Sequence, residues 1–101
     1  MLIYTTTIHV EHKIKAIVIK YIVEKHFMQL EESNLTKDYG LYKLQQQEDS
    51  EGESLSLQYK FDNNETLEAF LLLIDSKLKE ELSRLYFYKV LFFSHILEKI
   101  N

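Results

Sequence analysis

The chain has 101 residues, a net charge of −4, 46% apolar residues and no cysteine, proline or tryptophan. This composition is typical of one folded domain spanning 1–101, and it excludes disulfides, thiolate metal sites and cysteine nucleophiles. Nucleic-acid binding lacks its electrostatic signature, because 16 acidic side chains outnumber 12 basic ones and no basic block occurs.

Residues 2–11 (LIYTTTIHVE) predict the first strand, because β-branched residues are frequent and the side chains alternate. One face carries Leu2, Tyr4, Ile8 and Val10, and the other carries Ile3, Thr5, Thr7, His9 and Glu11. No basic segment and apolar core of a signal peptide precede this strand, and no run reaches the roughly 18 apolar residues of a spanning helix. We therefore expect a cytoplasmic protein that does not enter a membrane.

Residues 14–30 favour a helix over a strand. The β-branched run at residues 17–19 favours a strand, but the segment is too long for a typical one. Its apolar side chains instead fit a helical stripe, formed by Ile14, Ile17, Val18, Tyr21 and Ile22. The N-cap is poor, because His12 is not a favoured capping residue.

Residues 38–47 predict a second, weaker strand, and residues 54–61 (SLSLQYKF) predict a third one. The third strand alternates, with Leu55, Leu57, Tyr59 and Phe61 directed inward. Between them, residues 48–53 (EDSEGE) indicate a solvated connection. Its acidic residues, Glu48, Asp49, Glu51 and Glu53, could bind a cation weakly, but they lack the spacing of a calcium loop.

A second helix is predicted from Asp62 to about Leu85. Asp62 and Glu65 have the spacing of a capping box. The apolar stripe comprises Leu67, Phe70, Leu71, Ile74, Leu78, Leu82 and Leu85. On the solvated side we expect the i,i+4 ion pairs Asp75–Lys79, Lys77–Glu81 and Glu80–Arg84.

Residues 86–100 (YFYKVLFFSHILEKI) predict a last strand that is unusually long and apolar on both faces. A strand that is apolar on both faces is covered on both faces. Two helices can cover only one face, so we expect a second copy of the chain to cover the other. Leu91, Phe93 and Leu97 are the candidate interface residues. The aromatic residues Tyr86, Phe87, Tyr88, Phe92 and Phe93 could alternatively line a ligand site, but we favour core and interface.

The element order β-α-β-β-α-β predicts an α+β, ferredoxin-like fold. Right-handed crossovers place both helices on one face of a four-stranded antiparallel sheet with the spatial order 4-1-3-2.

The segments MLIYTTTIHVEH, SLSLQYKFDNNETLEAF and FFSHILEKI resemble a family of bacterial proteins of about 100 residues that is classified as a domain of unknown function. The resemblance implies a shape similar to the dimeric α/β-barrel proteins, which pair two ferredoxin-like sheets face to face and include cofactor-free monooxygenases. The family has no established activity. Its members carry tryptophans and a His-Ile-Pro step, where this chain has His26-Phe27-Met28.

Four residues could form a divalent-metal site: His9, Glu11 and His12, with His95 across the sheet. We favour a solvated strand end and expect neither a metal nor another cofactor. His9 and His95 are also weak candidates for a general acid–base pair. The alternative is that these polar groups contact a partner copy or water.

The open sheet face is predicted to carry weak candidates for ligand binding, namely Thr5, Thr7, Ser56, Gln58 and Lys60. We favour a small homodimeric binding or structural module without catalysis. The alternative is a cofactor-free enzyme that acts on a small organic molecule in a cleft on this face. A regulatory ligand-binding domain is a third reading.

Overall fold

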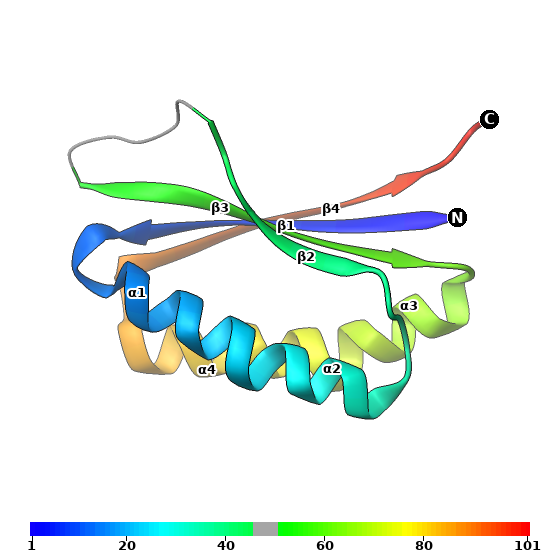
Figure 1. The fold of residues 1–101 in the computed structure, drawn as a ribbon, viewed down its shortest axis with the longest axis horizontal. Coiled ribbons are helices and arrows are strands. Elements are labelled where there is room, and N and C mark those ends of the chain that lie inside the picture. The colour runs from blue at the N-terminus through cyan, green and yellow to red at the C-terminus, as the bar shows by residue number, and fades with distance from the viewer. Residues whose placement is uncertain (46–50) are drawn as a thin grey trace.

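The computed structural model describes residues 1–45 and 51–101, apart from the side chain of Tyr88. Four strands form one sheet, and two helical arms cover one of its faces (Figure 1). The strands are β1 (Leu2–Glu11), β2 (Tyr39–Lys43), β3 (Gly52–Phe61) and β4 (Val90–Glu98). The first arm comprises α1 (His12–Tyr21), the π segment η1 (Ile22–His26) and α2 (Phe27–Ser33). The second comprises α3 (Asn64–Phe70), the π segment η2 (Leu71–Asp75) and α4 (Ser76–Tyr86).

The sheet order β2-β3-β1-β4 and the antiparallel pairing confirm the predicted ferredoxin-like, α+β fold. β1 lies between β3 and β4, so that Thr5 faces Gln58 on one side and His95 on the other. In β4, Val90 is buried, whereas the interface candidates Leu91 and Phe93 are exposed on the opposite face.

Several strand boundaries differ from the prediction. β4 begins at Val90, because α4 continues through Tyr86 and a 3₁₀ turn, η3 (Phe87–Lys89), follows it. β2 ends at Lys43, and residues 46 and 47 of the predicted second strand lie outside the described residues. Residues 48–50 of the predicted acidic connection lie outside them as well.

Glu53, which was predicted to lie in that solvated connection, instead belongs to β3 and is only 1% exposed. Lys15 Nζ donates to Glu53 Oε2 at 2.6 Å, and Lys43 Nζ lies 3.3 Å from Oε1. The hydrogen bond from Lys15 lowers the pKa of Glu53, and Lys43 adds to this effect against the opposing cost of burial. The carboxylate is buried because two lysines neutralise it.

The first arm buries Ile14, Val18, Ile22, His26 and Leu30, each four residues after the last. Four such steps on a regular α-helix rotate the stripe by about 160°, because each step turns about 40° too far. The wider turn of η1 opposes this drift, and all five residues are buried. Ile17, predicted to lie in the stripe, is exposed.

The second arm has the same arrangement. Its residues 70, 74, 78 and 82 are buried, and the π segment η2 lies in the middle of this series. Asn63 caps α3 by accepting a 2.9 Å hydrogen bond from the Thr66 N–H, so the predicted capping role of Asp62 is wrong. Asp75, predicted on the solvated side, is only 4% exposed, whereas Leu85 is exposed. Arg84 pairs with Glu81.

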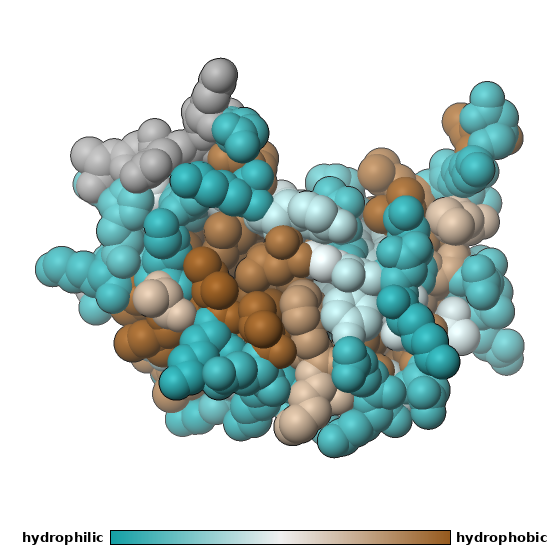
Figure 2. Space-filling view, in the orientation of Figure 1, coloured by the Kyte–Doolittle hydropathy of each residue, from teal (hydrophilic) through white to brown (hydrophobic). Residues whose placement is uncertain are grey.

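The core lies between the sheet and the two arms, and Leu57, Phe70 and Leu82 are among its fully buried side chains. Figure 2 shows apolar side chains gathered on the side between β2 and the first arm. Ile19 of the first arm and Leu41 of β2 are partly buried and pack against the core. No helix within the described ranges is long and apolar enough to cross a membrane.

Candidate functional site

The open face of the sheet, opposite the helices, carries its apolar side chains along β4. Leu91, Phe93 and Leu97 are 49%, 62% and 51% exposed, and they project from alternate positions of this edge strand. Phe92 points to the other face and packs against the core. Phe92 and Phe93 therefore lie on opposite faces of the sheet and do not share one ligand site.

Polar side chains occupy the centre of the open face. Thr5 and Ser56 are buried by their neighbours, whereas Gln58, Lys60 and His95 are exposed. The ladder places Thr7 between Ser56 on β3 and Phe93 on β4. The short hydroxyl side chains of Thr5, Thr7 and Ser56 thus form a polar floor. Longer side chains of the neighbouring strands lie beside it.

The two histidines of the open face do not lie together. His9 pairs with Leu91, and His95 pairs with Thr5, four positions away along β1. At 3.3 Å per residue this separates them by about 13 Å. His9 Nδ1 lies 3.2 Å from the Ser54 hydroxyl. A direct acid–base pair of His9 with His95 is therefore excluded within one chain.

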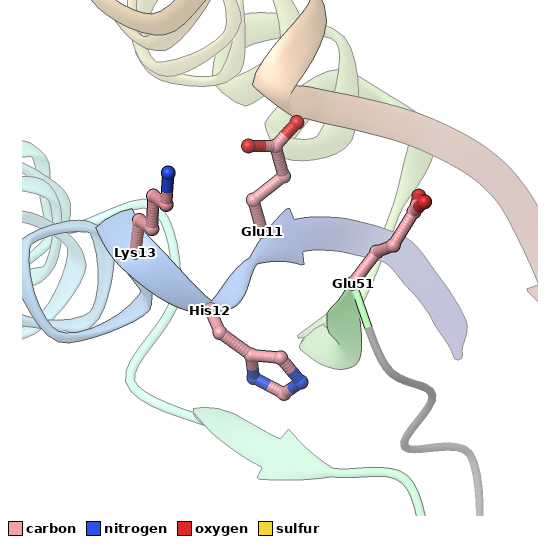
Figure 3. A pocket seen from close by; sticks show the side chains of 4 residues that line it. All are labelled: Glu11, His12, Lys13 and Glu51. Atoms are coloured by element: carbon pink, nitrogen blue, oxygen red, sulfur yellow. The ribbon is translucent and has the colours of Figure 1, made fainter.

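A surface pocket of about 390 Å³ lies at the end of β1 and is lined by Glu11, His12, Lys13 and Glu51. Figure 3 shows that the His12 ring points away from the Glu11 carboxylate, so these side chains do not converge. In the part of the chain that the structure describes, no three His, Asp or Glu side chains lie together in a way that could hold a metal ion.

The core contains a polar cluster that the sequence did not indicate. His26, at the end of η1, is fully buried, and its Nε2 lies 2.7 Å from the hydroxyl of Tyr59 on β3. Burial lowers the pKa of His26 to about 4, so the ring is neutral at pH 7. Burial also raises the pKa of Tyr59 well above its usual value, and the charge of Asp75 adds to this effect.

A second polar group lies on the other side of Tyr59, whose ring stacks on that of Tyr4 at 6.0 Å. Tyr4 donates a hydrogen bond to Asp75 Oδ2 and accepts one of 2.7 Å from Lys79. Lys79 Nζ also lies 3.0 Å from Asp75 and donates to Ser94 at 2.8 Å. Burial opposes the charge of Lys79, but its bonds to Tyr4 and Asp75 outweigh this effect and raise its pKa.

Each π segment ends on one of these buried polar residues, His26 in η1 and Asp75 in η2. His26 Nδ1 and Asp75 Oδ1 have no hydrogen-bond partner among the described residues. Buried polar atoms without a partner are rare, and π segments occur frequently at functional sites. The sequence signal for His26 is its place in the series of buried residues spaced by four, where the other four members are apolar.

Residues 1–100 match the model of a family described as "Domain of unknown function (DUF4286)". No curated protein matches the chain. Among solved structures, the chain is similar to a dimeric ferredoxin-like protein from an uncultured marine organism, with 10% identity over 99% of this chain and 95% of the other and a TM-score of 0.79.

A protein from Deinococcus radiodurans, described as a candidate antibiotic biosynthesis monooxygenase, is 16% identical over 100% of this chain and 94% of its own, with a TM-score of 0.75. A de novo designed protein is 14% identical over 97% of both chains, with a TM-score of 0.66. At these identities the similarities establish the fold alone.

Proposed function

The chain belongs to the DUF4286 family, and we propose that it acts as a homodimeric binding or structural module in which the open faces of two sheets pack together. The exposed apolar row on β4 carries this proposal. Leu91, Phe93 and Leu97 lie on the face that the helices leave uncovered. Such a row is an aggregation liability in a monomer and a suitable contact in a dimer.

Burial of the apolar row on β4 would stabilise a dimer substantially. Each of these three side chains is about half exposed, so covering it contributes on the order of 1 kcal/mol. A symmetric dimer doubles this gain, because the same residues of both copies are covered. The similarity in fold to a protein described as dimeric and ferredoxin-like supports the same assembly.

The polar floor gives the dimer a place to bind a small molecule. Thr5, Thr7 and Ser56 lie at the centre of the face, and Gln58 and Lys60 stand beside them. When two sheets pack through their β4 rows, these hydroxyl and amide groups face the partner across the interface. They supply donors and acceptors without a nucleophile–base pair, which suits binding better than catalysis.

A second candidate function is a cofactor-free enzyme that acts on a small organic molecule at this site. The observation in its favour is the position of His95, which stands beside Thr5 in the polar part of the face. Imidazole is the side chain that enzymes use most often as a general acid or base. If the protein is such an enzyme, His95→Gln should abolish turnover of the small molecule, while binding of that molecule should persist.

Sedimentation velocity tests the dimer. The unmodified chain is expected to sediment as two chains, and Phe93→Glu as one, because a buried carboxylate without a partner costs several kcal/mol. Leu72→Glu is the matched control, since Leu72 is 74% exposed on the outer side of the helices. It should remain dimeric. A monomeric unmodified chain, or a dimeric Phe93→Glu, overturns the proposal.

A further inference from the structure

A surface pocket of about 330 Å³ lies where α2 ends and β2 begins, away from the open sheet face. Its lining residues are Glu31, Lys37 and Tyr39. The Tyr39 hydroxyl donates a hydrogen bond to the Glu31 carboxylate, which raises the pKa of Tyr39 to about 12. The charges of Glu31 and Lys37, which both line the pocket, are opposite in sign and cancel. The volume of the pocket is at the lower end of the range for small-molecule sites.

Two aromatic rings connect this pocket to His26. The Tyr39 ring lies 4.7 Å from that of Phe27, and the Phe27 ring lies 5.8 Å from the imidazole of His26. Phe27 and Tyr39 are only partly buried, whereas His26 is completely covered. Tyr39 therefore joins the pocket to the buried imidazole through Phe27, and its hydroxyl is held by the hydrogen bond to Glu31.

The proton of the His26 ring can be located from its partner. The buried Tyr59 hydroxyl keeps its proton, and among the described residues its hydrogen-bond partner is His26 Nε2. If Nε2 donated to Tyr59 instead, both the Tyr59 proton and Nδ1 would lack partners among the described residues. We therefore assign the hydrogen bond as Tyr59 donating to Nε2, with the single proton of the neutral ring on Nδ1. Nδ1 is then a buried N–H donor that lacks an acceptor within the described residues. Such a donor costs free energy unless an acceptor reaches it.

We propose that this pocket and His26 form a binding site for a small, uncharged, planar molecule with a hydroxyl or carbonyl oxygen. The oxygen accepts the hydrogen bond from His26 Nδ1, and the ring of the molecule packs against Phe27 and Tyr39.

The surroundings define this chemistry. A cation or anion at His26 would meet a neutral imidazole behind aromatic rings, so its charge would be uncompensated and costly. A flat ring can pack against Phe27 and Tyr39 in the offset or edge-to-face arrangements that aromatic rings favour. The oxygen supplies the one acceptor that the buried donor lacks. The site lies within one chain, so it does not depend on the proposed dimer.

Phenol is a suitable probe, with benzene as its matched control, because benzene has the same ring without the oxygen. The ¹⁵N and ¹H signals of the histidine rings report on each nitrogen separately. In the unmodified protein, phenol should shift the Nδ1–H signal of His26 and saturate on the order of millimolar concentration. Benzene should leave the Nδ1–H signal in place. An Nδ1–H signal that phenol does not move, or a ring protonated on Nε2, overturns the proposal.

The variant His26→Gln distinguishes the role of Nε2 from that of Nδ1. A glutamine oxygen can still accept the hydrogen bond from Tyr59, whereas the Nδ1–H donor is lost. Phenol affinity, followed through the backbone amides of residues 27 and 39, should fall about tenfold, which is the value of one hydrogen bond. His12→Gln, the same change at the start of α1, should bind phenol like the unmodified protein. Equal affinity of the His26→Gln variant contradicts the proposal. If that variant does not fold, the Nδ1–H signal of the unmodified protein decides.

Discussion

Tyr4 on β1 donates a 2.9 Å hydrogen bond to Asp75, 71 residues later in the chain. This bond attaches the π segment of the second helical arm to the middle of the sheet. His26 and Tyr59 form the corresponding bond from the π segment of the first arm. Both arms are therefore fixed to the sheet by polar contacts inside the core, and these contacts give the first predictions.

Tyr4→Phe should lower the free energy of unfolding by about 1–2 kcal/mol, because it removes a buried donor from Asp75 and an acceptor from Lys79. Urea denaturation measures the effect. Tyr42→Phe removes the same hydroxyl from a residue that is 53% exposed, and it should change the stability by less than about 0.5 kcal/mol. Equal effects of the two variants would show that the Tyr4–Asp75 bond adds nothing.

Acid should destabilise the fold through His26. The unfolded ring has a pKa of about 6.5, and the folded ring has a pKa of about 4. Below pH 6.5 the unfolded chain therefore binds a proton that the folded chain does not, and the folded state loses about 2 kcal/mol between pH 6.5 and pH 5. Above pH 6.5 both states hold a neutral ring, and the effect ends.

Urea denaturation of the unmodified chain and of His26→Gln at several pH values isolates this term, because the other titrating groups are common to both proteins. The difference in stability should change with pH between 6.5 and 4 and remain constant from pH 7 to 8. A difference that is independent of pH throughout would mean that His26 titrates alike in the folded and unfolded chains.

Glu53→Gln should destabilise the fold, because Lys15 and Lys43 would lose the carboxylate that both contact. The pKa of Glu53 is lowered in the folded state, so its contribution is present at neutral pH and is lost as the pH falls through that pKa. Thermal unfolding measures the effect. Asp38→Asn is the control, since the Asp38–Lys60 pair is exposed and contributes little. If Asp38→Asn lowers the melting temperature as much as Glu53→Gln does, the buried Glu53 carboxylate has no special contribution to stability.

His9→Ala should leave the stability nearly unchanged, with a loss of less than about 1 kcal/mol. His9 is partly exposed, and its side-chain partner is the Ser54 hydroxyl at 3.2 Å. Thermal unfolding provides the measurement. A larger loss would show that His9 has a structural role where the end of β1 pairs with the start of β3. A Cβ added to Gly52 there would lie 2.9 Å from Nε2 of His9.

The strands could be predicted from the sequence, because period-two alternation is a direct consequence of strand geometry. Their order followed from the element order and the right-handed crossovers. Leu55, Leu57, Tyr59 and Phe61 alternate with polar residues, and all four are buried. In the last strand both faces are apolar, and Leu91 and Phe93 were assigned to the open face because Lys89, His95 and Lys99 share their parity. The start of this strand was placed too early, because Tyr86, Phe87 and Tyr88 have high strand propensity, whereas α4 runs to Tyr86 and η3 follows it.

The polar core was missed because histidine and aspartate side chains are usually placed on the solvated side of a helix. Asp75 was therefore assigned to that side, although it is 4% exposed at the end of η2. Ile17 in α1 and Leu85 in α4 fit an apolar stripe by their spacing, yet both are exposed. Glu53 was misplaced for a different reason. A run of acidic residues indicates a loop, and the lysines that neutralise Glu53 come from α1 and β2, so only the tertiary fold brings them together.

Small-angle X-ray scattering of the unmodified chain tests the central claim of a dimer through the open sheet face most directly. The account predicts a forward scattering equal to two chains, about twice 12.1 kDa, and a radius of gyration well above the 13.6 Å of one chain. Scattering at the mass of one chain, with a radius of gyration near 13.6 Å at every concentration, would contradict it.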